Sequence, residues 1–385
     1  MQYRKFGRHN FKVSALGFGC MRFPLQAGAD PIQESDKIDE EKAIAMLRHA
    51  IDNGIDYVDT AYPYHKGESE KVVAKALRDG YRERVKLATK LPVWLAETHE
   101  DFDKLLDEQL NKLETEYVDF YLLHALNRRT WKKIMDLNVL DFVDRALADG
   151  RINYAGFSFH DAPDLFREIV DAYPWSFCQI QYNYLDENTQ AGRDGLKYAA
   201  DKNLAIVIME PLLGGKLASK PPREIQRLWD ASGLQRTPAQ WALHWLWNHP
   251  EVTTVLSGMT TMSDLEENLR TAANAHPNQM GPEELQIVEA VRDKFHSLTK
   301  VNCTQCGYCT PCESANVMIP HIFTLYNNAL MFEDAAEARA SYKRVMGNER
   351  DAARCIECGI CEPACPQGIP IIEKLKEAHN YLSRE

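Results

Sequence analysis

The spacing of the cysteines constrains this chain more than any other feature of its sequence. Eight of its ten cysteines lie after residue 300. They form two runs, CxxCxxCxxC and CxxCxxCxxxCP, at Cys303, Cys306, Cys309 and Cys312 and at Cys355, Cys358, Cys361 and Cys365. Four thiolates at this pitch are typical of iron–sulfur ligation, and each cluster restricts how the loops around it can fold. We therefore expect two 4Fe-4S clusters in a C-terminal domain.

Zinc sites and disulfides are the alternatives to clusters. Paired CxxC motifs also form tetrahedral zinc sites, and an even number of cysteines can indicate disulfides. Disulfide frameworks belong to short secreted chains, however, and the N-terminal MQYRKFGRHN lacks the apolar run of a signal peptide. Zinc sites need two pairs of cysteines, whereas each run here is an unbroken quadruplet and the second ends in Cys-Pro. The runs therefore favour iron–sulfur clusters.

The ligands of the two clusters can be assigned by a rule for two-cluster ferredoxins, in which the fourth cysteine of each run binds the cluster of the other run. The rule predicts one cluster on Cys303, Cys306, Cys309 and Cys365, and the other on Cys355, Cys358, Cys361 and Cys312. Residues 319–354 between the runs form a long helical segment, so this domain resembles the α-helical ferredoxins. Large apolar residues are few after residue 299, and we expect the cluster bonds to replace a hydrophobic core.

The longer N-terminal part alternates short apolar runs with amphipathic helical stretches, which is typical of parallel strands joined by crossover helices. Eight strands are expected, over residues 13–20, 57–60, 85–90, 120–124, 154–158, 178–182, 205–209 and 253–257. Eight such units predict a (β/α)8 TIM barrel, with a hairpin over residues 2–12 outside the count. A helix over 282–298 leads into the first cysteine run without a Pro- or Gly/Ser-rich linker. We therefore divide the chain into a barrel domain, 1–298, and a small α-helical ferredoxin-like iron–sulfur domain, 299–385.

The net charge of the chain limits which classes of molecule it can bind. A net charge of -11 and an isoelectric point near 5.6 repel the phosphates of nucleic acids and anionic membrane surfaces. No stretch approaches the length of a membrane span. We expect a cytoplasmic protein that acts on small molecules or on other proteins, with no nucleic acid and no membrane partner.

Four polar residues stand where barrel catalysis would place them. Asp59 and Tyr64 follow the second strand in DTAYPY, Lys90 ends the third in LATKLP, and His124 ends the fourth in YLLHA. Alone, each residue type is ordinary on a protein surface. In order and position they resemble the Asp-Tyr-Lys-His tetrad of the aldo-keto reductases, over residues 6–273. The resemblance implies an NAD(P)H-dependent oxidoreductase that reduces a carbonyl to an alcohol, or the reverse.

The resemblance also gives each member of the tetrad a role. Reduction of a carbonyl by hydride needs a proton donor, and Tyr64 would be that general acid. A free phenol has a pKa near 10, and we expect the ammonium of Lys90 to lower it. Asp59 would pair with Lys90, and His124 would orient the carbonyl oxygen. Trp94, just past Lys90, is a candidate for the substrate pocket.

Residues for the nicotinamide half of the cofactor follow from the same resemblance. Ser158 in GFSFH and Gln179 in CQIQYN match the residues that hold the carboxamide. The asparagine usual beside that serine is replaced by Phe159. Met209 takes the position of the tyrosine that stacks on the nicotinamide ring, so a thioether would replace an aromatic face.

The adenosine half would lie along the end of the barrel sequence. Leu212 to Gly215, with Gly214 among them, match the pyrophosphate loop. The segment SGMTTMSDLEENL matches the one that grips adenosine, from Ser257 and Gly258 to Glu267 and Asn268. Asp264 occupies a place where many relatives carry a basic residue for the 2′-phosphate, which favours NADH over NADPH. Thr260, Thr261 and Ser263 leave phosphate binding open.

Three functions are compatible with these features. In the first, the reductase site is coupled to clusters that carry electrons to or from an electron-transfer protein, although a hydride moves two electrons and a cluster takes one, and no flavin motif is evident. In the second, the reductase is accompanied by structural or redox-sensing clusters. In the third, the chain is a nucleotide-sensing redox binding protein without turnover. The identity of the carbonyl or alcohol substrate lies in the barrel loops.

Overall fold

The computed structural model describes residues 1–29, 34–303, 309–310, 312, 314–347, 349–365 and 367–384. The chain forms two compact units, Met1–Gly215 with Ala239–Gly281 and Lys216–Pro238 with Pro282–Glu385. The second unit is thus built from two separate parts of the chain. Packing divides the chain after residues 215, 238 and 281, and the domain limit drawn at residue 298 stays a prediction.

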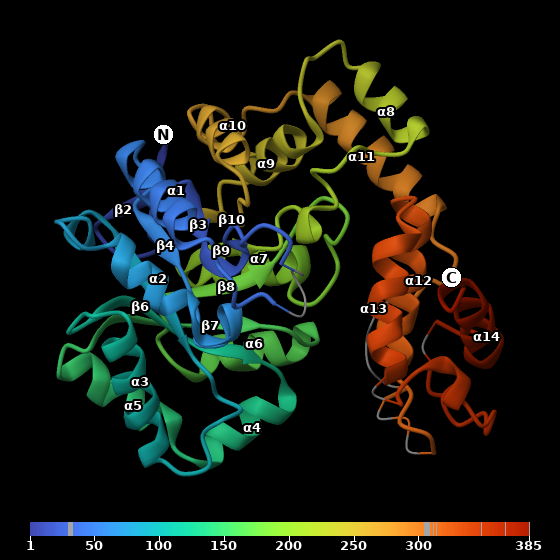
Figure 1. Ribbon diagram of the computed structural model, residues 1–385, viewed down its shortest axis with the longest axis horizontal. Coiled ribbons are helices and arrows are strands. Elements are labelled where there is room, and N and C mark those ends of the chain that lie inside the picture. The colour runs from blue at the N-terminus through green and yellow to red at the C-terminus, as the bar shows by residue number, and fades with distance from the viewer. Residues whose placement is uncertain are drawn as a thin grey trace. The chain divides into compact units, whose positions relative to one another are not determined.

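The first unit is a closed barrel of eight parallel strands in the order β10-β3-β4-β5-β6-β7-β8-β9, which confirms the predicted TIM barrel (Figure 1). The strands are β3 (Leu16–Gly19), β4 (Tyr57–Asp59), β5 (Lys86–Leu91), β6 (Val118–Leu126), β7 (Ile152–Phe159), β8 (Phe177–Gln181), β9 (Ala205–Met209) and β10 (Thr254–Ser257). Its helices are α1 (Glu40–Asp52), α2 (Ser69–Ala76), α3 (Glu100–Lys112), α4 (Arg128–Asp136), α5 (Val139–Ala148), α6 (Pro163–Ala172), α7 (Gly192–Asp201), α9 (Pro238–Asn248) and α10 (Met262–Ala272).

The N-terminal hairpin corrects the start of the first predicted barrel strand. Its strands are β1 (Tyr3–Lys5) and β2 (Lys12–Ser14), paired antiparallel. Val13 and Ser14 therefore belong to the hairpin, and Ala15 still donates its N–H to the carbonyl of Gln2. The barrel strand begins at Leu16, and Ala15 links the two sheets, because its N–H bonds to the hairpin while its carbonyl accepts the N–H of Val255 at 3.0 Å.

Aromatic side chains fill the barrel at the starts of its strands. Phe6, from the hairpin loop, stacks on Phe120 of β6 with 4.6 Å between ring centroids and lies 5.6 Å from Phe177 of β8. All three side chains are fully buried. The amino-terminal end of the barrel is thus closed by apolar packing, which leaves the carboxyl ends of the strands for the functional side chains.

The second unit contains α8 (Arg223–Asp230), α11 (Pro282–Ser297), α12 (Ile319–Met331), α13 (Ala335–Gly347) and α14 (Ile371–Leu382). An ion pair of 2.6 Å joins Arg236 to Glu284 of α11, and a second joins Glu224 of α8 to Lys294 of α11. The segment 319–354, predicted to be helical, forms the two helices α12 and α13 and a 3-10 turn over Ala352–Arg354.

The C-terminal residues have a hydrophobic core of their own, and the expectation that cluster bonds replace such a core is wrong. Buried residues from α12, α13 and α14 form this core, among them Ile322, Phe323, Tyr342, Leu375 and Leu382. Their apolar positions are far apart in sequence but fall on facing sides of three helices. Six described cysteines pack against this core, namely Cys303, Cys309, Cys312, Cys355, Cys361 and Cys365. Among the described residues, no helix is long and apolar enough to span a bilayer.

Candidate active site

Lys90 is the centre of the cluster of polar side chains at the carboxyl ends of the strands. Its ammonium donates hydrogen bonds to Asp59 Oδ2 at 2.7 Å, to the carbonyl of Thr60 at 2.8 Å and to the phenol oxygen of Tyr64 at 3.1 Å. Asp59 pairs with Ala88 in the neighbouring strand, and Lys90 lies two residues further on the same face. The Lys90 side chain is fully buried, and all three of its N–H donors are used.

Tyr64, and not Tyr62, contacts Lys90. Tyr62 points to α3, where its hydroxyl donates to Glu108 at 3.4 Å and Lys112 Nζ lies 3.9 Å from its ring centroid. The turn that carries Tyr64 continues into His65, whose φ of 51° is left-handed. The His65 ring holds this turn, because Nε2 accepts the N–H of Phe23 at 3.1 Å.

His124 reaches the same place from the end of β6. Its ring centroid lies 6.2 Å from that of Tyr64 in an edge-to-face arrangement and 5.2 Å from that of Trp94. Its Nδ1 is buried and has no hydrogen-bond partner among the described residues. Trp94 is 37% exposed. The structure thus brings Asp59, Tyr64, Lys90 and His124 together at the ends of β4, β5 and β6.

Burial dominates the electrostatics of this cluster. It raises the pKa of Tyr64 by more than the ammonium of Lys90 lowers it, so the net shift is upward. This is opposite to the predicted lowering, because the cost of burying a phenolate exceeds the attraction of one cation. Burial alone would lower the pKa of Lys90, but Asp59 and Tyr64 raise it overall. Burial, with the charge of Lys90, holds the pKa of His124 well below its usual value. At neutral pH the phenol and the ammonium are therefore protonated, and the imidazole is neutral.

A buried network of polar side chains, which sequence reasoning missed, contacts the backbone carbonyl of Lys90. Gln109 Nε2 donates to the carbonyl of Lys90 at 3.0 Å, to Thr89 Oγ1 at 3.0 Å and to Glu70 Oε1 at 2.7 Å. Tyr121 donates its hydroxyl to Gln109 Oε1 at 2.8 Å. The available signal was a polar residue on an apolar helix face, since Gln109 continues the buried positions of Phe102, Leu106 and Leu110 in α3.

Ser158 and Gln179 pair with each other on the adjacent strands β7 and β8, near the carboxyl ends. Gln179 is 2% exposed, and its Oε1 is buried without a partner among the described residues, while Nε2 contacts Met209 Sδ at 3.5 Å. An orphaned amide oxygen at a strand end is suited to the N–H donors of a carboxamide. Ser158 Oγ accepts the N–H of Ala125 at 2.7 Å. Phe159 is fully buried against Phe166 and takes no part in the site.

Arg22 is a basic residue at the carboxyl ends of the barrel strands, here called the rim, and sequence reasoning missed it. A Cβ on Gly258 would lie 3.1 Å from Arg22 Cδ, and one on Gly214 would lie 3.3 Å from Arg22 Nη2. Gly214 itself has a left-handed φ of 67°. The exposed guanidinium makes no hydrogen bond or ion pair within the described parts of the chain, so its charge is available beside the predicted pyrophosphate loop. The only sequence signal was the place of Arg22 just after the first barrel strand.

The predicted adenosine segment forms the start of α10. Thr261 and Asp264 form a capping box, in which Asp264 Oδ2 accepts the N–H of Thr261 at 3.0 Å. Asn268 Nδ2 donates to Ser257 Oγ at 2.9 Å, and this buried bond ties α10 to β10. Glu267 lies one residue before Asn268 and is half-buried. A carboxylate therefore already occupies the N-terminus of α10.

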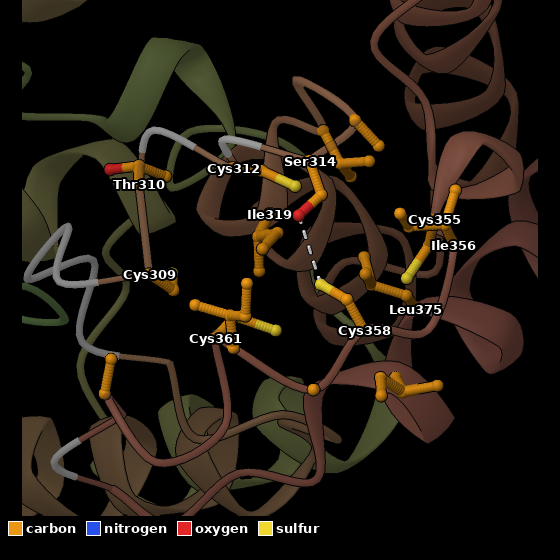
Figure 2. Close-up of a pocket in the computed structure, with 16 residues that line it drawn as sticks. Cys309, Thr310, Cys312, Ser314, Ile319, Cys355, Ile356, Cys358, Cys361 and Leu375 are labelled. Atoms are coloured by element: carbon orange, nitrogen blue, oxygen red, sulfur yellow. Dashed lines mark hydrogen bonds between the residues drawn. The ribbon is translucent and has the colours of Figure 1, made fainter.

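Five described cysteines of the second unit line one cavity of about 190 Å³ (Figure 2). It is lined by Cys309, Cys312, Cys355, Cys358 and Cys361, with Ile319 and Leu375 among the apolar residues of its wall. Ser314 Oγ lies 3.3 Å from Cys358 Sγ, so the loop after Cys312 contacts the second run. Among the described residues, no three acidic, histidine or cysteine side chains could hold a single metal ion. Several thiols on one apolar cavity fit a multi-atom iron–sulfur cluster, whose ligands bind different iron atoms. Cys306 lies outside the described residues.

The sequence of the barrel decides the family. Residues 15–291 match the sequence model of the aldo/keto reductase family. The chain belongs to this family. Within the barrel of this aldo/keto reductase, the thiols of Cys20 and Cys178 are fully buried, and burial raises the pKa of both.

Known proteins agree with this aldo/keto reductase assignment. The chain is 26% identical over 303 residues to a probable aldo-keto reductase of Glycine max, covering 70% of this chain and 84% of that protein. It is also 26% identical over 327 residues to the L-galactose dehydrogenase of Arabidopsis thaliana, covering 78% and 97%. An aldo-keto reductase from Bacillus halodurans in its holo form is structurally similar, with a TM-score of 0.62, 25% identity, and coverage of 76% of this chain and 96% of that one.

This aldo/keto reductase also carries a second domain. Residues 302–370 match the model of a 4Fe-4S dicluster domain, which contains all eight cysteines of the two runs. The chain is therefore an oxidoreductase of the aldo/keto reductase family joined to an iron–sulfur domain, as the two halves of the sequence predict.

Proposed function

We propose that this chain is an NAD(P)H-dependent oxidoreductase that interconverts a carbonyl and an alcohol, with Tyr64 as the general acid. The observation that carries the proposal is the position of Lys90, which contacts the phenol of Tyr64 at 3.1 Å and the carboxylate of Asp59 at 2.7 Å at the ends of the barrel strands. Small-molecule chemistry on a barrel is located at these ends.

The four polar residues divide the work of moving one proton. Tyr64 is kept protonated by burial, so its hydroxyl can give a proton to a carbonyl oxygen placed beside it. As that proton leaves, the ammonium of Lys90 stabilises the phenolate, and Asp59 holds the ammonium in place. The neutral ring of His124 orients the carbonyl oxygen against the phenol. Trp94, beside His124, would form part of the substrate pocket.

The cofactor would lie along the ends of β7 to β10. Bound nicotinamide supplies or accepts the hydride. Gln179 and Ser158 would hold its carboxamide, and Met209 would lie against the ring. Leu212, Gly214 and Gly258 would lie along the pyrophosphate, and Arg22, whose side chain lies against Gly214 and Gly258, would add a positive charge there. Ser257, Glu267 and Asn268 belong to the adenosine side. The carboxylate of Asp264 at the start of α10 would repel a 2′-phosphate, so we propose a preference for NADH.

The cysteines would hold two 4Fe-4S clusters in the crossed arrangement, with Cys312 completing the set of Cys355, Cys358 and Cys361, and Cys365 completing the set of Cys303, Cys306 and Cys309. Cys312 lines one cavity with Cys355, Cys358 and Cys361, as the first of these sets requires, and Cys309 of the other set lines it too. Because α12 to α14 have their own core, the clusters are not required to build that core. We therefore propose that they exchange electrons with the barrel site or with an electron-transfer protein.

Anaerobic purification with iron and sulfide analysis, followed by a panel of carbonyls and alcohols with both nucleotides, tests the proposal. We expect turnover with NADH or NAD⁺, and a change in the visible cluster spectrum when NADH is added. Turnover with an unchanged spectrum would leave the reductase and remove the electron exchange. Nucleotide binding without turnover of any compound would identify a nucleotide-sensing binding protein instead.

A further inference from the structure

We propose that Ser158 is a positioning residue for His124, acting through the backbone N–H of Ala125. Ser158 and His124 lie on neighbouring strands, β7 and β6, and the sequence assigns Ser158 only to the cofactor. The structure adds a hydrogen bond of 2.7 Å from Ala125 N to Ser158 Oγ. The link to the cofactor rests on the proposed function, whereas the link to His124 rests on the hydrogen bond alone.

The backbone at His124 is a bulge. The pairing of β6 with β7 is regular up to Leu123 with Phe157, and resumes at Leu126 with Phe159 after a shift in register. Ala125, inside the bulge, has a φ of 53°. A left-handed conformation is unfavourable for alanine and persists only where the surroundings hold it. Bulges of this kind change the direction in which a side chain points, and here that side chain is His124.

Ser158 holds this bulge at the N–H of Ala125, while Asn127 Nδ2 donates to the Ala125 carbonyl at 3.5 Å. The Ser158 side chain is almost fully buried, and its Oγ accepts the N–H that the register shift removes from regular strand pairing. Among the described residues, the His124 ring makes ring contacts with Tyr64 and Trp94, and its Nδ1 has no hydrogen-bond partner. Because no hydrogen bond fixes Nδ1, the direction of the ring depends on its backbone, which Ser158 holds at Ala125.

A hydroxyl has one donor and two acceptor positions. Accepting from Ala125 leaves the proton of Ser158 free to donate to the carboxamide oxygen of a nicotinamide. Ser158 Oγ would then contact both the carboxamide of the cofactor and the backbone that orients the His124 ring. Loss of this atom should weaken cofactor binding and also disturb the orientation of the substrate carbonyl. Other contacts to the carboxamide would not combine these two effects.

Gln179 supplies the matched control. It is also assigned to the carboxamide, but its Nε2 contacts Met209 Sδ and it makes no hydrogen bond to the described residues of the bulge. Full-length protein with its clusters, labelled with ¹³C in histidine and free of nucleotide, is compared as wild type, Ser158→Ala and Gln179→Met. The His124 resonance is assigned from its loss in His124→Asn.

We expect the His124 resonance and its pH titration to change in Ser158→Ala and to stay at the wild-type values in Gln179→Met. With NADH, both variants should bind about tenfold more weakly, the scale of one lost hydrogen bond to a ligand, and Ser158→Ala should lose more kcat at saturating NADH than Gln179→Met. If Ser158→Ala does not fold, Ser158→Cys keeps the volume with a weaker acceptor and should give a smaller shift of the same resonance.

An unchanged His124 resonance and titration in the serine variants would overturn the proposal. Because the resonance is measured without nucleotide, this result is independent of whether the wild type binds NADH or turns over a carbonyl. A further variant tests the bulge itself. Glycine tolerates a positive φ, so Ser158→Ala with Ala125→Gly should recover part of kcat but none of the NADH affinity. If kcat in this double variant recovers no more than the NADH affinity does, a role of Ser158 through Ala125 is contradicted.

Discussion

Lys90 Nζ donates a hydrogen bond of 3.1 Å to the phenol oxygen of Tyr64 and lies 4.7 Å from the centroid of the same ring. The cation is thus in contact with both the oxygen and the π-face of one tyrosine. Burial raises the pKa of Tyr64, and Lys90 opposes that shift. The ammonium therefore determines how readily a buried phenol can release its proton, and the first two predictions follow from this pair.

Replacing Tyr64 by Phe should lower turnover by about 10²-fold or more, the usual scale for a lost general acid, while NADH affinity stays nearly the same. The phenol lies beside Lys90, whereas the carboxamide contacts are on other strands. Steady-state kinetics and fluorescence titration with NADH measure the two quantities. Tyr62→Phe is the control, because Tyr62 faces α3. Loss of turnover in the Tyr62 variant, with turnover kept in the Tyr64 variant, would reverse the assignment.

Replacing Lys90 by Met should reduce turnover to a similar extent and move the pH profile. Reduction needs a protonated phenol, so activity falls as the pH rises through the pKa of Tyr64. Without the ammonium that pKa rises further, and the basic limb should shift to higher pH. The variant also leaves Asp59 buried without its cation, at a cost of about 3–5 kcal/mol of stability. Lys90→Met with Asp59→Asn removes this cost, and a smaller upward shift should persist, because the charge of Asp59 also raises the pKa of Tyr64. If an active variant keeps the basic limb of its pH–activity profile at the wild-type position, Lys90 does not set the pKa of Tyr64.

Replacing Arg22 by Met should weaken the binding of ADP-ribose by about 10- to 100-fold, the scale of lost hydrogen bonds to a charged group. Adenosine lacks the phosphates, so its affinity should be unchanged. Calorimetry with both compounds separates a phosphate contact from a general disturbance of the rim. Arg22→Lys keeps the charge and should recover part of the affinity. Equal weakening of adenosine and ADP-ribose would count against a phosphate contact.

The crossed ligand sets can be tested by comparing single cysteine variants in pairs. Cys365→Ser should give the same electron paramagnetic resonance spectrum as Cys303→Ser, because both would damage one cluster. Cys312→Ser should match Cys355→Ser, since these two cysteines line the same cavity together with Cys358. Should Cys365→Ser instead match Cys355→Ser, each run would bind its own cluster and the crossed assignment would fail.

Removing the clusters by anaerobic chelation should leave most of the C-terminal helices folded. The reason is the apolar core formed by α12, α13 and α14, which includes Phe323, Tyr342 and Leu382. Hydrogen exchange followed by mass spectrometry should show retained protection in these helices and lost protection at residues 355–365. The barrel helices of the same sample provide the internal control. Rapid exchange throughout α12 to α14 would show that the clusters, and not the core, hold these helices.

The parts of the site predictable from the sequence are those fixed by strand position. Asp59, Lys90 and His124 end successive strands, and in a closed parallel barrel such residues must meet at one rim. Tyr64 was found through the resemblance, because its place in a loop has no periodicity. The upward pKa shift of Tyr64 was not predictable, since it depends on how completely surrounding side chains exclude water.

Features that depend on long-range packing were missed for a related reason. Arg22 meets Gly214 and Gly258 only because closure of the barrel brings the ends of β3, β9 and β10 together. The core of the second unit joins residues from α12 and α14 that are about fifty positions apart, and counting apolar residues along the sequence underestimated it. The bulge at Ala125 has no glycine to mark it, so its left-handed backbone left no sign in the sequence.

The discontinuous second unit has a consequence for how the chain is made. Residues 216–238 leave the barrel sequence and return to it, yet they pack with residues that follow position 281. On the ribosome, α8 is therefore synthesised before α11, the helix that carries the ion-pair partners of Glu224 and Arg236. A protein shortened at residue 281 would complete every barrel strand but leave these residues without those partners. Shortened forms of the protein should therefore keep α11, or carry a redesigned 216–238 segment, to remain monodisperse.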